Sequence, residues 1–262
     1  MGTPVPLPQS TKHTTLLYLH PSLQCIQQAS NSPESKDYHI MQSTAPIASG
    51  SVLLVEHVIH GTESHLQKVL AVDTAFSDML DPREGTEGCN EPINKIKHNA
   101  FIGPDGSMRL GPIVTRFNHR CDPDCSVRYV YEETECKFRR HTRKDGFAVI
   151  YAMRDIKSDQ EVCYQYNSYA HDLFGCDCGR TGEERDAILE RNRDVVGPPM
   201  VEANRMFLEG LIGQFLDKRE ATCAYCGKEV QNLCKGCESV SYCGAACQRS
   251  DWAAHKVICK AT

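Results

Sequence analysis

This chain of 262 residues lacks long hydrophobic runs and has only a small net charge. No apolar run approaches the roughly 20 residues of a membrane-spanning helix, so we expect no membrane partner. His20 and Pro21 interrupt the partly apolar stretch of residues 16–26, and we therefore expect no signal peptide. The formal net charge is −5, so the chain lacks the overall basic field that attracts nucleic acid. Direct nucleic-acid binding is not expected.

Cysteine, in contrast, is abundant. The chain has 15 cysteines, and most of them are grouped at metal-ligand spacings. This usage suits a reducing compartment, which predicts a location in the nucleus or the cytoplasm. Hydrophobic residues make up 40% and charged residues 24%, as in an ordinary globular protein of one or two domains.

Eight metal-ligand candidates occupy the C-terminal segment as four short pairs. They are Cys223 and Cys226, Cys234 and Cys237, Cys243 and Cys247, and His255 and Cys259. Eight ligands fill two tetrahedral zinc sites. A disulfide framework explains neither the repeated gaps nor the odd cysteine count completed by a histidine. The segment is too small to bury a sizeable core, so metal binding and folding should be one event.

The last two pairs indicate local structure. Residues 244–260 contain no proline and are expected to form a helix. Positions i and i+4 share a helical face, so each of the last two pairs points one way. Trp252, the single tryptophan, is expected to plug the small core between them. The spacing leaves sequential, interleaved and nested sharing of the two metals open.

The run from Cys223 to Cys259 resembles a MYND-type zinc finger, including its Tyr-Cys and Cys-Gln dipeptides and its Trp-x2-His-x3-Cys ending. This resemblance covers about one-seventh of the chain and implies the interleaved order. Cys223, Cys226, Cys243 and Cys247 would hold one zinc, and Cys234, Cys237, His255 and Cys259 the other. It also implies structural zinc ions and a protein partner, commonly a proline-containing peptide.

We predict an α+β protein of four parts. Residues 1–37 are rich in Pro, Ser, Thr and Gln and are expected to be poorly ordered. A folded domain of strands and helices spans residues 38–178, with a strand near 51–58 and helical spacing over 63–80. Helices broken at residues 197–199 form a linker over 179–218, and the finger occupies 219–262.

Three features of the middle domain carry chemistry. The first is a polar, turn-rich segment over residues 117–125. The second is a pair of alternating strands around Tyr129 and Val149, for which Asp145-Gly146 predicts the hairpin turn. The third is an alternating strand over 161–166. Taken singly, each feature has an ordinary structural explanation, such as turn chemistry or core tyrosines.

In this order the three features resemble a SET domain, the fold of protein-lysine methyltransferases that use S-adenosylmethionine. The motifs are an Asn-His-x-Cys-x-Pro segment from Asn118, an Ala-x-x-Asp-Ile stretch from Ala152, and a glutamate-led strand ending in tyrosine. The resemblance spans about half the chain. It implies small sheets, a pseudoknot in which the segment from Asn118 passes under the last strand, cofactor contacts from Asn118 and His119, and an active-site Tyr166.

The resemblance also suggests a third metal site. Cys176-x-Cys178 follows the last strand, and Cys121 lies in the central motif. These three thiolates should come together in space, whether as zinc ligands or as ordinary buried cysteines. Cys125, a water or His171 would complete the coordination shell of a metal.

Departures from the family pattern keep a second function open. The expected Gly-x-Gly falls on Tyr38-His39-Ile40, Arg120 replaces a usual serine, and Asp124 replaces a usual asparagine. The tail lacks a third cysteine, and the finger follows the SET-like domain instead of interrupting it. The two hypotheses are therefore a lysine methyltransferase whose finger recruits a protein, and a non-catalytic scaffold with a degenerate SET domain.

Overall fold

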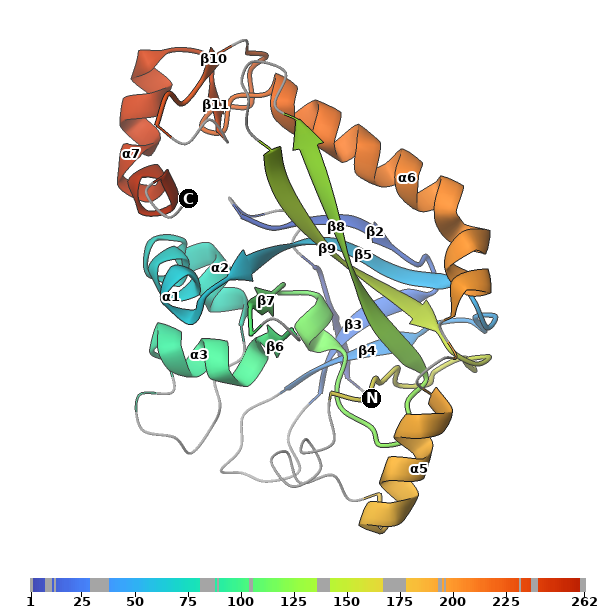
Figure 1. Ribbon diagram of the computed structural model, residues 1–262. Coiled ribbons are helices and arrows are strands. Elements are labelled where there is room, and N and C mark those ends of the chain that lie inside the picture. The colour runs from blue at the N-terminus through green and yellow to red at the C-terminus, as the bar shows by residue number, and fades with distance from the viewer. Residues whose placement is uncertain are drawn as a thin grey trace.

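The computed structural model describes residues 2–7, 11, 13–28, 38–80, 88, 90–103, 106–135, 142–166, 178–192, 195, 197–230, 232–236 and 240–259. The strands are β1 (Thr3–Val5), β2 (Thr15–Leu19), β3 (Leu23–Gln28), β4 (Tyr38–Ser43), β5 (Val52–Gly61), β6 (Phe101–Ile102), β7 (Met108–Leu110), β8 (Cys125–Glu135), β9 (Thr142–Ala152), β10 (Asn232–Leu233) and β11 (Ser241–Tyr242). The helices are α1 (Glu63–Val72), α2 (Thr74–Met79), α3 (Pro92–Asn99), α5 (Gly182–Asn192), α6 (Pro198–Ala221) and α7 (Ala245–Cys259), with a 3-10 turn η1 (Val114–Arg116). The fold is α+β, as predicted (Figure 1).

Strand β5 is the centre of the largest sheet. It pairs antiparallel with β9, β2 and β7, and the six-stranded sheet continues to β8 and β6. Its first eight residues are buried. Strands β1, β3 and β4 form a second sheet, and β10 with β11 a third. These are the small sheets expected from the sequence.

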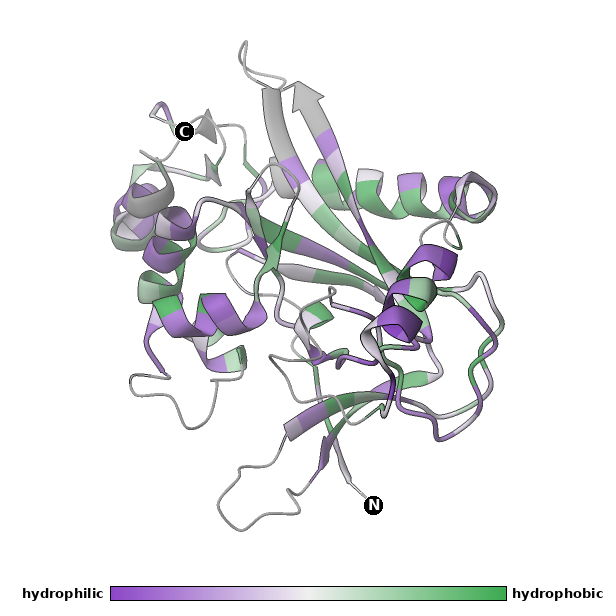
Figure 2. Cartoon of the chain, turned by 60° about the horizontal axis from the view of Figure 1, so that its bottom comes forward, coloured by the Kyte–Doolittle hydropathy of each residue, from purple (hydrophilic) through white to green (hydrophobic). Residues whose placement is uncertain are grey.

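The two faces of the large sheet have different coverings. One face packs into the main core with Val114, Phe117 and Tyr164. The opposite face carries Val149 and Tyr151, against which α6 packs through Leu208. Figure 1 shows α6 lying along this sheet, and in Figure 2 its surface alternates between hydrophobic and hydrophilic segments. The sheet is therefore buried on both sides.

The turn predicted at Asp145-Gly146 is wrong. Both residues lie inside β9, where Gly146 faces Tyr131 and Asp145 faces Glu132. Asp145 is buried and its Oδ1 lies 3.0 Å from Nε2 of His57. A Cβ at Gly146 would come within 3.2 Å of His60 Nδ1. A buried hydrogen bond and a close approach, not a turn, thus account for this dipeptide.

The prediction of a poorly ordered N-terminal segment is wrong for its described residues. Strands β1, β2 and β3 lie there, and Leu23, Cys25 and Ile26 are buried. Their backbone groups pair with β4 and β5, which supply the partners that the local composition does not reveal.

Most of the helical predictions are confirmed. Helices α1 and α2 occupy the region with helical spacing, and α6 begins directly after Gly197, with proline at its first positions. The limits of the four predicted parts stay predictions. Among the residues described, no helix combines the length and the apolar character needed to cross a bilayer.

Candidate functional site

The segment that begins at Asn118 runs beside the last extended segment of the middle domain. Tyr164 N–H donates to the carbonyl of Asn118 at 3.1 Å, and Arg120 N–H donates to the carbonyl of Tyr164 at the same distance. Isolated bridges join Tyr164 to His119 and Cys125 in parallel, so residues 161–166 form bridges and not the full strand that was predicted. This pairing is the crossing expected of the pseudoknot.

The crossing brings three predicted site residues together. Tyr166 N–H donates to Nδ1 of His119 at 3.3 Å, and their ring centroids lie 5.4 Å apart. The hydroxyl of Tyr166 donates to the carbonyl of Phe117 at 3.1 Å. Asn118 lies between Phe117 and His119 in the same loop. The roles of Tyr166, Asn118 and His119 stay predictions, but their proximity does not depend on those roles.

The side chain of Asn118 connects the crossing to β4. Its amide nitrogen donates to Oε1 of Glu161 at 2.9 Å and to the carbonyl of His39 at 3.3 Å. Nη1 of Arg116 lies 2.6 Å from Nδ1 of His39. His39 is the middle residue of the tripeptide that stands at the expected Gly-x-Gly. The segment in which the family pattern has its glycines therefore lies next to the central motif in space.

Tyr166 belongs to a cluster of four aromatic rings. Phe101 lies 5.8 Å from Tyr129, 5.5 Å from Tyr164 and 6.4 Å from Tyr166, and the last two rings are 4.7 Å apart. The hydroxyls of Tyr129 and Tyr164 are buried and have no hydrogen-bond partner among the described residues. Burial raises the pKa of both phenols well above the ordinary value. The cluster thus combines apolar ring surface with neutral, unpaired hydroxyls.

A cleft of about 600 Å³ is lined in part by His119. Its lining is mostly charged and consists of His119, Arg120, Asp122, Asp124, Arg154, Asp155, Lys157, Gln160, Glu161, Cys163, Cys178 and Arg180. This volume lies within the range of small-molecule sites in proteins.

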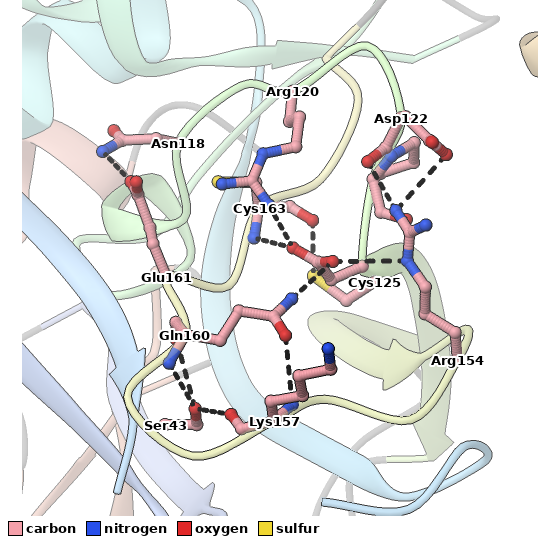
Figure 3. Close-up of polar contacts among 12 residues, drawn as sticks. Ser43, Asn118, Arg120, Asp122, Cys125, Arg154, Lys157, Gln160, Glu161 and Cys163 are labelled. Carbon is pink, nitrogen blue, oxygen red and sulfur yellow. Dashed lines mark hydrogen bonds and ion pairs between the residues drawn. The ribbon is translucent and has the colours of Figure 1, made fainter. Parts of the chain in front are cut away.

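Asp124 has four partners around the cleft wall, and Figure 3 labels all four of them: Arg120, Arg154, Gln160 and Cys163. One carboxylate oxygen accepts from Gln160 Nε2 at 2.8 Å and lies 3.3 Å from Arg154 Nε. The other accepts from Arg120 Nη1 at 3.1 Å and from Cys163 N–H at 3.2 Å. Burial raises the pKa of Asp124, although Cys163 N–H and both arginines act in the opposite direction. The carboxylate therefore links three segments at the crossing.

This network explains two departures from the family pattern. Arg120 and Asp124 replace the usual serine and asparagine, and they form an ion pair with each other. The opposite charges four residues apart were a signal that sequence reasoning missed. Asp122, on the same loop, forms ion pairs with Arg154, Arg180 and Arg191, with distances of 3.0–3.3 Å between the guanidinium nitrogens and the carboxylate oxygens.

The predicted third metal site is described only in part, because Cys176 and His171 lie outside the described residues. Cys121 is buried, with its sulfur 3.3 Å from Nε2 of His119. Cys178 lies on the wall of the cleft. The grouping of the three cysteines stays a prediction.

The first four-cysteine cluster of the finger is complete. The sulfurs of Cys223, Cys226, Cys243 and Cys247 lie within 4.8 Å of one another. Burial raises the pKa of Cys223, but N–H groups of Cys243, Cys226 and Tyr225 outweigh it and lower the pKa to about 6. Four cysteine sulfurs at these mutual distances can fill one tetrahedral zinc site, so this donor set fits the metal.

The second cluster contains Cys234, His255 and Cys259, all buried; Cys237 lies outside the described residues. Burial lowers the pKa of His255, more than Asp251 raises it, which favours the neutral imidazole that a metal needs. A Cβ at Gly236 would lie 2.9 Å from the sulfur of Cys259, so only glycine leaves this approach open. The two clusters alternate along the chain, which is the interleaved grouping.

Helix α7 positions the later ligands. It carries Cys247, His255 and Cys259, and the hydroxyl of Tyr242 in β11 donates to Oδ2 of Asp251 at 2.7 Å. Trp252 is 41% exposed, so the prediction that it plugs the core is wrong. The small core is instead formed by Tyr242 and buried metal-ligand cysteines.

Comparison with known proteins agrees with these two sites. The SET domain family matches residues 38–167, and the MYND finger family matches residues 223–259. The SET domain-containing protein L222 of Acanthamoeba polyphaga mimivirus is 24% identical over 200 residues, which cover 71% of this chain and 58% of that protein. Ubiquitin carboxyl-terminal hydrolase 19 of Arabidopsis thaliana is 49% identical over 47 residues, which cover 18% of this chain and 7% of that protein.

A solved structure from Plasmodium falciparum, of a protein assigned as a histone methyltransferase, is 11% identical. Its likeness covers 54% of this chain and 96% of that one, with a TM-score of 0.31. This chain spans less than two thirds of the length of the curated relatives described above. On its own motifs and on the family matches, the chain contains a SET domain over residues 38–167, followed by a MYND finger over residues 223–259.

Proposed function

We propose that this protein is an S-adenosylmethionine-dependent protein-lysine methyltransferase whose MYND finger binds a protein partner. The observation that carries the proposal is that Tyr166 lies beside the Asn118-His119 pair, although it is more than 40 residues away from that pair in the sequence. This arrangement would place a tyrosine beside the pair that we propose to hold the cofactor.

The aromatic cluster supports lysine as the acceptor. A lysine amine has an ordinary pKa of about 10.4 and must be neutral to attack a methyl group. Apolar rings favour the neutral amine by desolvation. The unpaired hydroxyls of Tyr129 and Tyr164 offer hydrogen-bond acceptors in the same place. We therefore assign alignment and desolvation of the amine to the rings around Tyr166.

Asn118 and His119 are the residues that we propose to hold the cofactor. When bound, S-adenosylmethionine supplies an activated methyl group on a sulfonium. The cleft beside His119 has a suitable volume, and the side chain of Asn118 donates to the carbonyl of His39 on β4. The protein's part is to bind, to orient and to exclude water.

Titration calorimetry with S-adenosylhomocysteine tests the cofactor proposal, and transfer of labelled methyl to candidate proteins tests the reaction. Tyr166→Phe should lower turnover by roughly 10- to 100-fold while cofactor affinity changes little. His119→Ala should instead weaken cofactor binding. A wild-type chain that neither binds the homocysteine nor transfers methyl contradicts the proposal.

The second candidate function is a non-catalytic scaffold, and the composition of β4 favours it. Tyr38, His39 and Ile40 stand where glycines would let the backbone approach the cofactor, and Ile40 is fully buried. In that case neither Tyr166→Phe nor His119→Ala affects any activity, and the finger alone acts.

For the finger we propose two structural zinc ions. Cys223, Cys226, Cys243 and Cys247 would hold one, and Cys234, Cys237, His255 and Cys259 the other. The grouping of the described sulfurs and the imidazole supports this set. A protein partner such as a proline-containing peptide, and a reducing nuclear or cytoplasmic location, belong to the same proposal.

A further inference from the structure

Glu56 carries a buried carboxyl group on β5, outside the motifs that begin at Asn118, Ala152 and Glu161. It is 1% exposed, and its oxygens accept hydrogen bonds from the backbone N–H groups of Ile113, at 3.0 and 3.3 Å, and Val114, at 2.8 Å. A buried carboxylate must have such partners, because an unpaired one is costly. Glu56 therefore fixes the start of the turn η1.

Gly111 makes this contact sterically possible. A Cβ at this position would lie 2.6 Å from Oε2 of Glu56 and 2.7 Å from Cγ1 of Val58. Side chain and glycine thus form one packed unit, in which the carboxylate occupies the space that a Cβ would fill.

The other end of η1 is held as well. Arg116 reaches His39 on β4 and the carbonyl of Met79 at the end of α2. Phe117 follows directly, and its carbonyl accepts the hydroxyl of Tyr166. The turn is therefore fixed at both ends immediately before the residues that meet Tyr166.

We propose that Glu56 is a positioning residue for the Asn118-His119 motif and for Tyr166. It acts through the backbone of residues 113–117 and touches neither of the reacting groups. This inference rests on the proposed methyltransferase function for its kinetic consequences, whereas its structural part can be measured without any activity.

The test uses the full chain and the variants Glu56→Gln and Gly111→Ala. Glutamine leaves an amide nitrogen facing the N–H donors, and alanine displaces the carboxylate from the opposite side. Glu209→Gln and Gly210→Ala are matched controls, since Glu209 is exposed and a Cβ at Gly210 meets no atom within 4 Å.

Two measurements decide the inference. Amide hydrogen exchange should accelerate about tenfold or more in peptides covering residues 111–119 but not in those covering β8 and β9. Turnover should fall by about 10- to 100-fold, while KM for the acceptor changes less than about threefold. Both controls should match wild type.

Unchanged exchange over residues 111–119, or equal acceleration in β8 and β9, would overturn the positioning role even in an active enzyme. If Glu56→Gln does not fold, Gly111→Ala decides by the same criteria. A wild-type chain without cofactor binding or methyl transfer removes the proposed function, and hydrogen exchange then still decides the role of Glu56.

Discussion

The buried carboxylates of Glu56 and Asp124 are stabilised by different partners. Asp124 has two arginines and an amide as partners, whereas Glu56 has backbone N–H groups and only the more distant charge of Arg116. Burial raises the pKa of Glu56 to about 8, more than the N–H groups of Val114 and Ile113 and the charge of Arg116 lower it. The two side chains should therefore respond differently to pH and to mutation.

Glu56 should make the protein less stable as pH rises. Its pKa of about 8 in the folded state exceeds its ordinary value of 4.5. Between these values the folded protein keeps a proton that the unfolded chain has lost, so the free energy of unfolding falls with rising pH. The slope from this group is at most about 1.4 kcal/mol per pH unit.

Urea unfolding at pH 6 and pH 8 checks this slope in wild type and in Glu56→Gln. Arg116 and Tyr129 face Glu56 and are present in both proteins. Glu56→Gln should lose less stability between the two pH values than wild type. An identical pH dependence in both proteins would refute the assignment.

Asp124 should be the costlier of the two loop carboxylates to remove. Asp124→Ala leaves two arginines and the Cys163 N–H without their buried acceptor, which should cost about 3 kcal/mol. Asp122→Ala is the control, because its side chain is 27% exposed against 3% for Asp124 and exposed ion pairs contribute about 0–1 kcal/mol. Chemical denaturation gives both values, and equal losses would contradict the distinction.

At the residue scale, sequence reasoning reached the site but not its supports. Asn118, His119 and Tyr166 carry a recognisable order along the chain. Glu56 lies outside those motifs, and its role could not be read from the sequence, because its partners are backbone N–H groups 57 and 58 residues away. Backbone partners have no identity in a sequence, so only the fold reveals them.

Among the elements, the finger depends on its metal ions. Cys234→Ala or His255→Ala should unfold the finger and leave the SET domain folded, because the segment has little core besides its ligands. Metal analysis of the full chain should give about two zinc ions per wild-type molecule and fewer in either variant. A wild-type content near zero would refute the two-site assignment.

Elements with strong local signals were predicted well, and those defined by distant partners were not. Helix α6 begins at Pro198, directly after Gly197, and was predictable, as was α7 from its ligand spacing. Strands β2 and β3 lie in a segment of irregular composition, and their partners β5 and β4 lie further along the chain. Asp145-Gly146 gave a false turn because local preference yielded to a buried contact with His57.

In the whole molecule, the finger is joined to the SET domain by more than the linker. Helix α7 packs against α1, which lies between β5 and the central motif in the sequence (Figure 1). Helix α6 crosses the outer face of the large sheet, where Phe215 contacts His57 and Phe147. The finger is thus a packed neighbour of the SET domain.

Removing zinc should therefore affect α1. We expect chelation to accelerate amide hydrogen exchange in residues 63–72 because α7 no longer covers them. Strands β8 and β9, which do not depend on α7, serve as the internal reference. Unchanged exchange in α1 after loss of both metals would contradict the contact.

The central place of β5 also has a consequence during synthesis. Its sequence from Val52 to Ile59 is apolar except for Glu56 and His57. Their partners, Ile113, Val114 and Asp145, emerge from the ribosome 57 to 88 residues later. Before these partners emerge, the strand is an apolar segment prone to aggregation, and we expect the charge of an ionised Glu56 to act as a gatekeeper. The side chain that is buried in the folded domain would thus also limit aggregation of the nascent chain.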